Sequence, residues 1–200
     1  VQECKLRYGV SLTPYKPYSW VEEGRVHGMN VELFRALADE AGCDYEIKTM
    51  LWPELLENFE NKSLDIIVSS LSPFPDSHKG ANVLQIPFNI AFYGYFYSRT
   101  DSPPVKNLED LQGKTVLVLQ GSVGHDHIQN IAEAYNITIR PYPTTERAME
   151  ALSKGEGDVS VFSLTAAINA LEHGGYTNIR VSGKPVFPAP YGFLFYDCAV

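Results

Sequence analysis

Short apolar segments alternate with segments of helical periodicity twice along this chain of 200 residues. In the first half, strands are predicted at 6–10, 45–49 and 65–70, with helices at 31–41 and from Pro53 onward. The segment 65–70 (DIIVSS) shows little polar alternation, which is typical of a parallel strand covered on both faces. Alternating strands and helices predict an α/β fold.

The helix predicted at 31–41 has apolar side chains at helical spacing, which are Leu33, Phe34, Leu37, Ala38 and Ala41. We expect Asn30 to cap its N-terminus and Gly42 to end it. The helix after Pro53 is expected to bury Leu55, Leu56 and Phe59.

A second series starts after residue 113. Strands are predicted at 115–119, 137–142 and 158–162, with helices at 128–135, 147–154 and 165–173. The spacing from Phe59 to Asp65 repeats in that from Leu152 to Asp158, so Ser70 and Ser163 are expected at equivalent strand ends. The chain therefore contains two related α/β units rather than a solenoid of many repeats.

Two apolar segments can join these units. Residues 89–99 (NIAFYGYFYSR) are strand-like, and the segment after Pro185 is aromatic and strand-like again. We expect one lobe at 1–88 and 191–200, a second at 97–184, and hinge strands at about 88–97 and 184–191. Open α/β sheets bind ligands at the carboxyl ends of their strands, so we expect a site in the cleft between the lobes.

Charge and hydropathy exclude several functions. Sixteen Lys and Arg against 24 Asp and Glu give a net charge of −8, and the cations are scattered, so nucleic acid is not an expected partner. No apolar run reaches the roughly 20 residues of a membrane span. A charged segment followed by an apolar one is also absent, so we expect any secretory signal to have been removed.

Three cysteines occur, at Cys4, Cys43 and Cys198. Cys4 and Cys43 each stand just before a predicted strand, and two neighbouring parallel strands would bring their sulfur atoms side by side. A disulfide between them would indicate an oxidising compartment, whereas two buried thiols are the alternative.

Several segments together resemble the family 3 extracellular solute-binding proteins, which include carriers of ABC importers and receptor sensor domains. They are 6–10 (LRYGV), 15–18 (YKPY), 28–33 (GMNVEL), 52–56 (WPELL), 65–72 (DIIVSSLS), 107–115 (NLEDLQGKT), 120–122 (QGS), 146–152 (ERAMEAL) and 190–192 (PYG). The resemblance implies a two-lobed periplasmic-binding-protein-like fold of type II, a clamshell with two interlobe crossings. It also implies a periplasmic or extracellular location, no cofactor, a small-molecule ligand, and a membrane permease or receptor signalling domain as partner. We expect a monomer.

The resemblance also implies which residues hold the ligand. Aromatic walls are expected from Tyr15, Tyr18 and Trp52. Hydroxyl and backbone groups are expected from Ser69, Ser70, Ser72, Gly121, Ser122 and Ser163. Each also has an ordinary structural explanation as a core-edge aromatic, a turn residue or a helix N-cap.

Two positions differ from the amino-acid-binding members of the family. The arginine that grips a ligand carboxylate there corresponds to Ser77, and the acidic residue that pairs with the ligand ammonium corresponds to Ser163. A hydroxyl cannot replace a bidentate, charge-assisted contact. We therefore expect a ligand other than an ordinary α-amino acid.

Catalytic and metal sites are not expected. Residues two apart on a helix face different ways, so His125 and His127 cannot share an ion there, and we expect both to be solvated. Ser122 lacks the first glycine of a Gly-x-Ser-x-Gly elbow. The stretch 163–168 has no carboxylate for dehydratase chemistry of the kind found in a few proteins of this fold.

Overall fold

The computed structural model describes residues 4–70, 80–85, 92–189 and 191–196. The chain divides into two compact units: unit 1 is Val1–Asn89 with Tyr191–Val200, and unit 2 is Ile90–Pro190. Within the described ranges, no helix is long and apolar enough to cross a membrane. The expected hinge strands fall partly on residues 86–91 and 190, which are outside the described residues, so the hinge remains a prediction.

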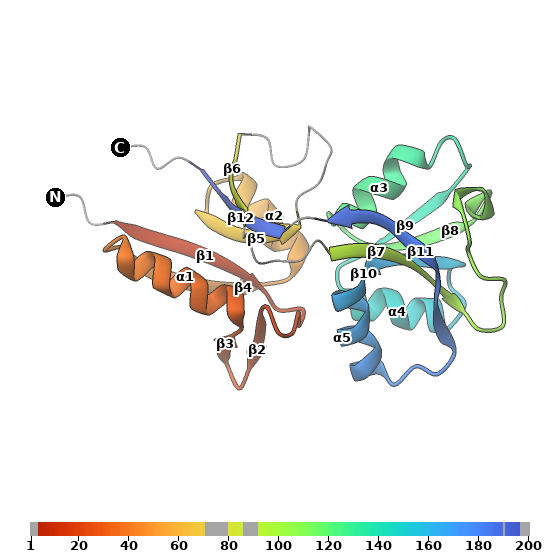
Figure 1. Cartoon of the computed structure of the whole chain (residues 1–200), viewed down its shortest axis with the longest axis horizontal. Coiled ribbons are helices and arrows are strands. Elements are labelled where there is room, and N and C mark those ends of the chain that lie inside the picture. Colours follow the sequence, from red (N-terminus) through yellow and green to blue (C-terminus); the bar gives the residue numbers. More distant parts are fainter. Residues whose placement is uncertain (1–3, 71–79, 86–91, 190, 197–200) are drawn as a thin grey trace. The chain divides into compact units, whose positions relative to one another are not determined.

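Unit 1 is built on a five-stranded sheet (Figure 1). Its order is β4 (Asp44–Met50), β1 (Lys5–Ser11), β5 (Ile66–Ser70), β12 (Tyr191–Phe195) and β6 (Asn82–Gln85). The first three strands are parallel, and β12 runs antiparallel to both β5 and β6. The helices are α1 (Met29–Glu40) and α2 (Trp52–Glu60), and a small hairpin pairs β2 (Trp20–Glu22) with β3 (Arg25–His27).

Unit 2 repeats this order. Its sheet runs β9 (Thr138–Tyr142), β8 (Thr115–Leu119), β10 (Val159–Ser163), β7 (Phe92–Arg99) and β11 (Ile179–Ala189). The first three strands are again parallel, and β7 is antiparallel to β10. The helices are α3 (Val123–Ile131), α4 (Thr145–Ser153) and α5 (Leu164–Gly174), with a 3-10 turn η1 (Leu108–Leu111).

Side-chain alternation along β8 explains the layers of unit 2. Val116 and Val118 pack in one cluster with Ile128 of α3, whereas Leu117 packs in another with Met149 of α4. Successive strand residues point to opposite faces, so α3 covers one face of the sheet while α4 and α5 cover the other (Figure 1). A strand buried on both faces accounts for the continuous apolar run in the sequence.

An aspartate sets the register of the central strands in each unit. The Arg7 amide donates to Asp65 Oδ2 and the Thr115 amide donates to Asp158 Oδ2, each at 2.8 Å. The reverse bonds, from the Asp65 amide to the Arg7 carbonyl and from the Asp158 amide to the Thr115 carbonyl, are both 2.9 Å. Asp65 and Asp158 therefore occupy equivalent places, and Ser70 and Ser163 end equivalent strands, as the spacing predicts.

In unit 1 the same aspartate, Asp65, also forms an ion pair. Arg7 Nε and Nη2 donate to Asp65 Oδ2 and Oδ1 at 2.9 and 2.8 Å, and this contact holds the pKa of the carboxyl below its usual value. A lowered pKa in the folded state stabilises the protein above the unfolded pKa of about 3.9, and that stability is lost as the pH falls through the folded pKa.

Replacing Asp65 with Asn is therefore expected to lower the free energy of unfolding by about 1–2 kcal/mol at pH 7, a value discounted because Arg7 is partly exposed. The difference from the wild type should shrink below about pH 3. Urea unfolding at both pH values measures it. Asp101→Asn, at a mostly exposed ion pair, is the matched control, and an equal loss in the two variants would rule out the register role.

Three predictions about helices are wrong. Gly28 rather than Asn30 is the N-cap of α1, because the backbone carbonyls of Pro17 and Tyr18 accept the Met29 and Asn30 amides at 3.1 and 3.0 Å. Leu37 is 42% exposed, because the buried stripe of α1 runs through Val31, Phe34 and Ala38. Finally, α3 starts five residues earlier than predicted and ends at Ile131, since Ser122 caps it by accepting from the His125 amide.

Candidate ligand-binding site

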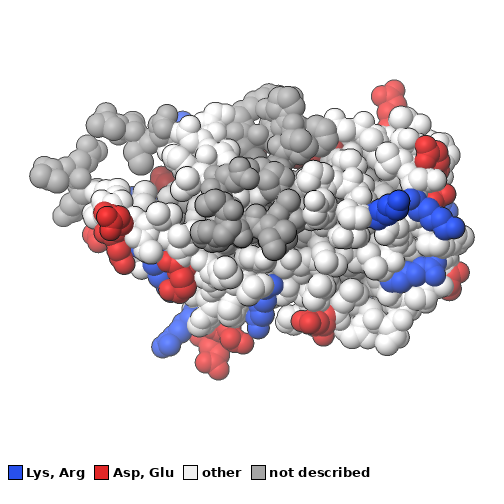
Figure 2. Space-filling model, viewed as in Figure 1, with Lys and Arg blue, Asp and Glu red and all other residues white. Residues whose placement is uncertain are grey.

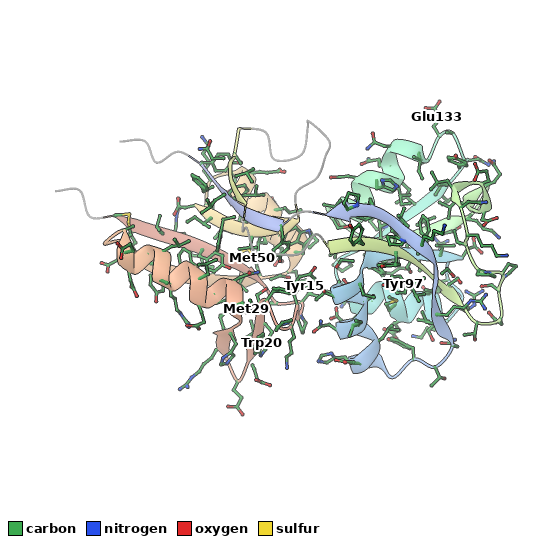
Figure 3. The ribbon with its side chains drawn as sticks, viewed as in Figure 1. Tyr15, Trp20, Met29, Met50, Tyr97 and Glu133 are labelled. Atoms are coloured by element: carbon green, nitrogen blue, oxygen red, sulfur yellow. A yellow bond between two sulfur atoms is a disulfide. The ribbon has the colours of Figure 1, made fainter. Side chains whose placement is uncertain are left out.

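The carboxyl ends of β1, β4 and β5 and the start of β12 meet at one edge of the unit 1 sheet. Ser11 of β1 pairs with Met50 of β4, and the Leu12 amide continues the ladder to the Met50 carbonyl at 2.9 Å. On the other side, Ser70 at the end of β5 pairs with Tyr191 at the start of β12. This register places Thr13, Trp52, Ser70 and Tyr191 along the same edge. Figure 3 shows Tyr15, Met29 and Met50 at this end of the sheet.

The loop after β1 is closed by its own backbone. The Tyr15 amide donates to the Ser19 carbonyl and the Tyr18 amide to the Tyr15 carbonyl, both at 2.8 Å. The carbonyls of Pro17 and Tyr18 also satisfy the first amides of α1, as described above. This double attachment fixes two of the predicted aromatic residues on the framework of the sheet.

Tyr15, Tyr18 and Tyr191 form a three-tyrosine cluster at this edge. The rings of Tyr15 and Tyr191 stack with centroids 5.8 Å apart, and Tyr18 lies 5.7 Å from Tyr15 and 6.3 Å from Tyr191. Burial raises the pKa of the Tyr191 phenol well above its usual value, helped by the neighbouring tyrosines and opposed by a hydrogen bond with Asn30. The Tyr191 phenol is therefore uncharged at neutral pH.

Two polar groups at this edge lack hydrogen-bond partners. Thr13 Oγ1 and Trp52 Nε1 are covered, yet neither has a partner within the described part of the chain. Sequence reasoning predicted Trp52 but missed Thr13 and Tyr191. The aromatic-rich return segment after Pro185 was the available signal for Tyr191, whereas nothing in the sequence marks the Thr13 hydroxyl.

The equivalent edge of unit 2 carries Gly121, Ser122 and Ser163. Ser122 caps α3 by accepting from the His125 amide at 3.1 Å, and Ser163 caps α5 by accepting from the Ala166 amide at 3.3 Å. Because Val118 pairs with Val161, the ends of β8 and β10 bring these residues to one edge. Both serines are helix caps, and their contact with a ligand remains a prediction.

Some predicted positions cannot be placed. Ser72 and Ser77 lie outside the described residues, and for Ser69 and Ser70 only the strand pairing is described. Among the described residues, no group of three or more His, Cys, Asp or Glu side chains could hold a metal ion.

The prediction that His125 and His127 are solvated is wrong. The Gly121 amide donates to His125 Nδ1 at 3.1 Å, and the His127 ring packs against Phe187 with centroids 4.9 Å apart. Burial lowers the pKa of both imidazoles. Both histidines are polar residues, so the sequence does not reveal that the helix carrying them packs against β8, β9 and β10.

These contacts predict a loss of stability in mild acid. A lowered folded pKa means that stability is complete above the unfolded pKa of about 6.5 and is lost as the pH falls through the folded pKa. His125→Gln keeps an acceptor at the third helical position without a titrating ring, so the loss between pH 7 and 5 should shrink by about 1 kcal/mol. Urea unfolding across this range checks it. His127→Gln leaves the bond from the Gly121 amide to His125 intact, so this variant should retain the part of the stability loss that is due to His125. An unchanged loss in His125→Gln would refute the assignment of this loss to His125.

Comparison with known proteins gives the family. The family model of bacterial extracellular solute-binding proteins, family 3, matches residues 6–111, more than half of the chain. The chain belongs to this family, whose members bind solutes and are not enzymes.

Relatives share parts of the sequence. An arginine-binding extracellular protein of Bacillus subtilis is 32% identical over 134 residues, which are 66% of this chain and 50% of the relative. An L-cystine-binding protein of Escherichia coli K12 is 21% identical over 159 residues, 79% of this chain and 59% of the relative. The chain thus spans about half to three fifths of these relatives.

Solved structures share the fold. An ancestral arginine-binding protein bound to arginine has a TM-score of 0.82 and 20% identity, covering 100% of this chain and 87% of that one. A histidine kinase sensor domain similar to periplasmic binding proteins has a TM-score of 0.81 and 22% identity, covering 99% and 85%. The chain has the periplasmic-binding-protein fold, with an α/β sheet in each unit.

Proposed function

We propose that this chain captures a small molecule outside the cytoplasm and delivers it to a membrane permease. The observation that carries the proposal is the matched strand edge of each unit. Tyr15, Tyr18 and Trp52 provide aromatic surface on unit 1, and Ser122 and Ser163 provide hydroxyl groups on unit 2.

A thermal-shift screen tests the proposal. A ligand that binds only the folded state raises the midpoint of unfolding, by an amount that grows with concentration over Kd. The screen should include amino acids, neutral planar metabolites and organic acids. At least one compound is expected to raise the midpoint in proportion to the logarithm of its concentration. A screen without any such compound would count against the proposal.

We also propose that the ligand is not an ordinary α-amino acid. Ser163, the N-cap of α5, is uncharged at the position where the family resemblance implies an acid in amino-acid carriers. Arg99, a candidate replacement cation, donates to the carbonyls of Leu152 and Gly157 at 3.3 and 2.9 Å. It follows Ser98, which pairs with the first residue of β10, so it lies at the opposite edge from Ser163. Lys79 lies outside the described residues, and Arg147 is exposed on α4.

Calorimetric titration with the twenty amino acids is expected to give dissociation constants weaker than about 1 mM. Burying an unpaired ligand charge costs several kcal/mol, which is comparable to most of a micromolar affinity of about 8 kcal/mol. Ser163→Asp, which restores an acid, is expected to improve binding of a cationic amine. A micromolar amino-acid ligand for the wild type would show that Ser163 and Ser77 do not exclude zwitterions.

A sensor domain is the second candidate function, because a histidine kinase sensor domain shares the fold over nearly the whole chain. Cells that lack the protein separate the two. Loss of ligand uptake supports a carrier, whereas loss of a ligand-dependent transcriptional response with uptake intact supports a sensor.

A further inference from the structure

Among the described Thr, Ser, Trp and Tyr residues, five have a covered polar atom without a hydrogen-bond partner. They are Thr13, Trp52, Tyr97, Thr145 and Ser160. Tyr97, Thr145 and Ser160 are at most 1% exposed, so no part of these residues reaches the surface. Thr13 and Trp52 differ, because both residues are partly exposed although their polar atoms are covered. They also lie at a sheet edge, where ligands of α/β folds bind.

Thr13 and Trp52 are neighbours by register. β1 and β4 pair up to Ser11 and Met50, and the ladder continues through Leu12, so Thr13 and Trp52 stand two positions beyond the last pair on adjacent strands. The Thr13 amide is fixed by a bond to Ser11 Oγ at 3.2 Å, and Trp52 is the first residue of α2. Both side chains are thus carried by the rigid framework of unit 1.

The chemistry of these groups defines what they can bind. An indole N–H only donates, and a threonine hydroxyl can donate as well as accept. A covered donor without a partner is costly, and folded proteins seldom keep one without a reason. Neither group carries a charge. Lys16, the cation of the neighbouring loop, is directed to the Trp20 ring at 5.3 Å and to Glu22 at 3.8 Å.

We infer that Thr13 and Trp52 determine ligand specificity by donating hydrogen bonds to a neutral carbonyl oxygen of a planar ligand. This inference rests on the proposed function and names the chemical class that the site accepts. Tyr15 and Tyr18, which are partly exposed at the same sheet edge, offer ring surface for a flat molecule. Sites that hydrogen-bond a polar group discriminate strongly against analogues without it, because their own polar groups then stay unpaired.

Stability of the free protein tests whether the Thr13 hydroxyl is unpaired. Thr13→Val removes a hydroxyl without a partner and should leave the thermal midpoint unchanged or raise it. Thr144→Val is the matched control, because the Thr144 hydroxyl accepts from the Arg147 amide at 3.2 Å as the cap of α4. That variant should unfold about 2–4 °C lower. An equal fall in Thr13→Val would overturn the inference.

Three planar compounds with carbonyl oxygens and one planar hydrocarbon test the ligand class. Uracil, hydantoin and benzamide are planar and carry carbonyl oxygens, whereas toluene is planar without one. At about 5–10 mM, at least one carbonyl probe should raise the wild-type midpoint by about 2–4 °C and toluene should not. Thr13→Val and Trp52→Phe should each weaken the responding probe roughly fivefold to tenfold, with circular dichroism confirming that both variants fold.

The outcomes separate this inference from the proposed function. Equal binding of the probe by wild type and both variants overturns the inference, as does a response to toluene alone or to no probe. If other compounds of the wider screen still bind, the proposed function stands without it. If no compound of either set binds, the proposed function itself is wrong.

Discussion

Replacing Gly28 with alanine is expected to cost about 3 kcal/mol or more in the free energy of unfolding, and to weaken ligand binding as well. Gly28 has φ of 124°, and a Cβ atom there would lie 2.2 Å from the Tyr18 carbonyl oxygen and 2.8 Å from Ser19 Cα. These are backbone atoms of the loop whose carbonyls accept the first amides of α1. The loop cannot move without losing those bonds and displacing Tyr15 and Tyr18.

Gly24→Ala is the matched control for this prediction. Gly24 also has a positive φ, 73°, but a Cβ atom there would meet nothing within 4 Å. The control should cost only about 1 kcal/mol, the conformational penalty of a left-handed residue. Urea unfolding of both variants gives the comparison. Equal losses would mean that the close approach of Gly28 to Tyr18 is unimportant.

Removing the disulfide is expected to cost about 4 kcal/mol. Cys4 and Cys43 are bonded across a sequence separation of 39 residues, and closing a loop of that length removes about this much entropy from the unfolded chain. The bond stands directly before the first rung of the β1–β4 pairing, Lys5 with Asp44. It therefore joins the two strands where they enter the sheet.

The double variant Cys4→Ser with Cys43→Ser should unfold about 8–16 °C below the oxidised wild type. Reduced wild type should match the variant, and the reductant should leave the variant itself unchanged. Differential scanning calorimetry with and without reductant measures both. Unfolding of oxidised and reduced wild type at one temperature would contradict a stabilising role.

The framework was predictable because its signals are local. Buried parallel strands are apolar throughout, and the spacing from Phe59 to Asp65 recurs from Leu152 to Asp158, which is enough to predict two related units. The Cys4–Cys43 bond was predictable because each cysteine stands just before a predicted strand. Predictions failed where a distant segment decides the outcome. The cap of α1 comes from the Pro17–Tyr18 backbone, and side-chain patterns cannot show it.

The candidate site was predictable only in part, for the same reason. Tyr15, Tyr18 and Trp52 could be predicted because they come just after predicted strands, at positions where the family resemblance implies ligand contact. Tyr191 joins them through the pairing of β12 with β5, which links residues about 120 positions apart. The missing partner of the Thr13 hydroxyl is a property of packing, and no sequence pattern reports it.

The place of β12 also bears on how the polypeptide folds as it is synthesised. This strand lies between β5 and β6, and β6 pairs with no other strand in the described sheet. Unit 2 is encoded by one continuous stretch, so its core can form as soon as that stretch has left the ribosome. Unit 1 must wait for its last strand. Until β12 emerges, β5 keeps an unpaired edge on the side where β12 will pair, and a finished unit 2 is attached to an unfinished unit 1.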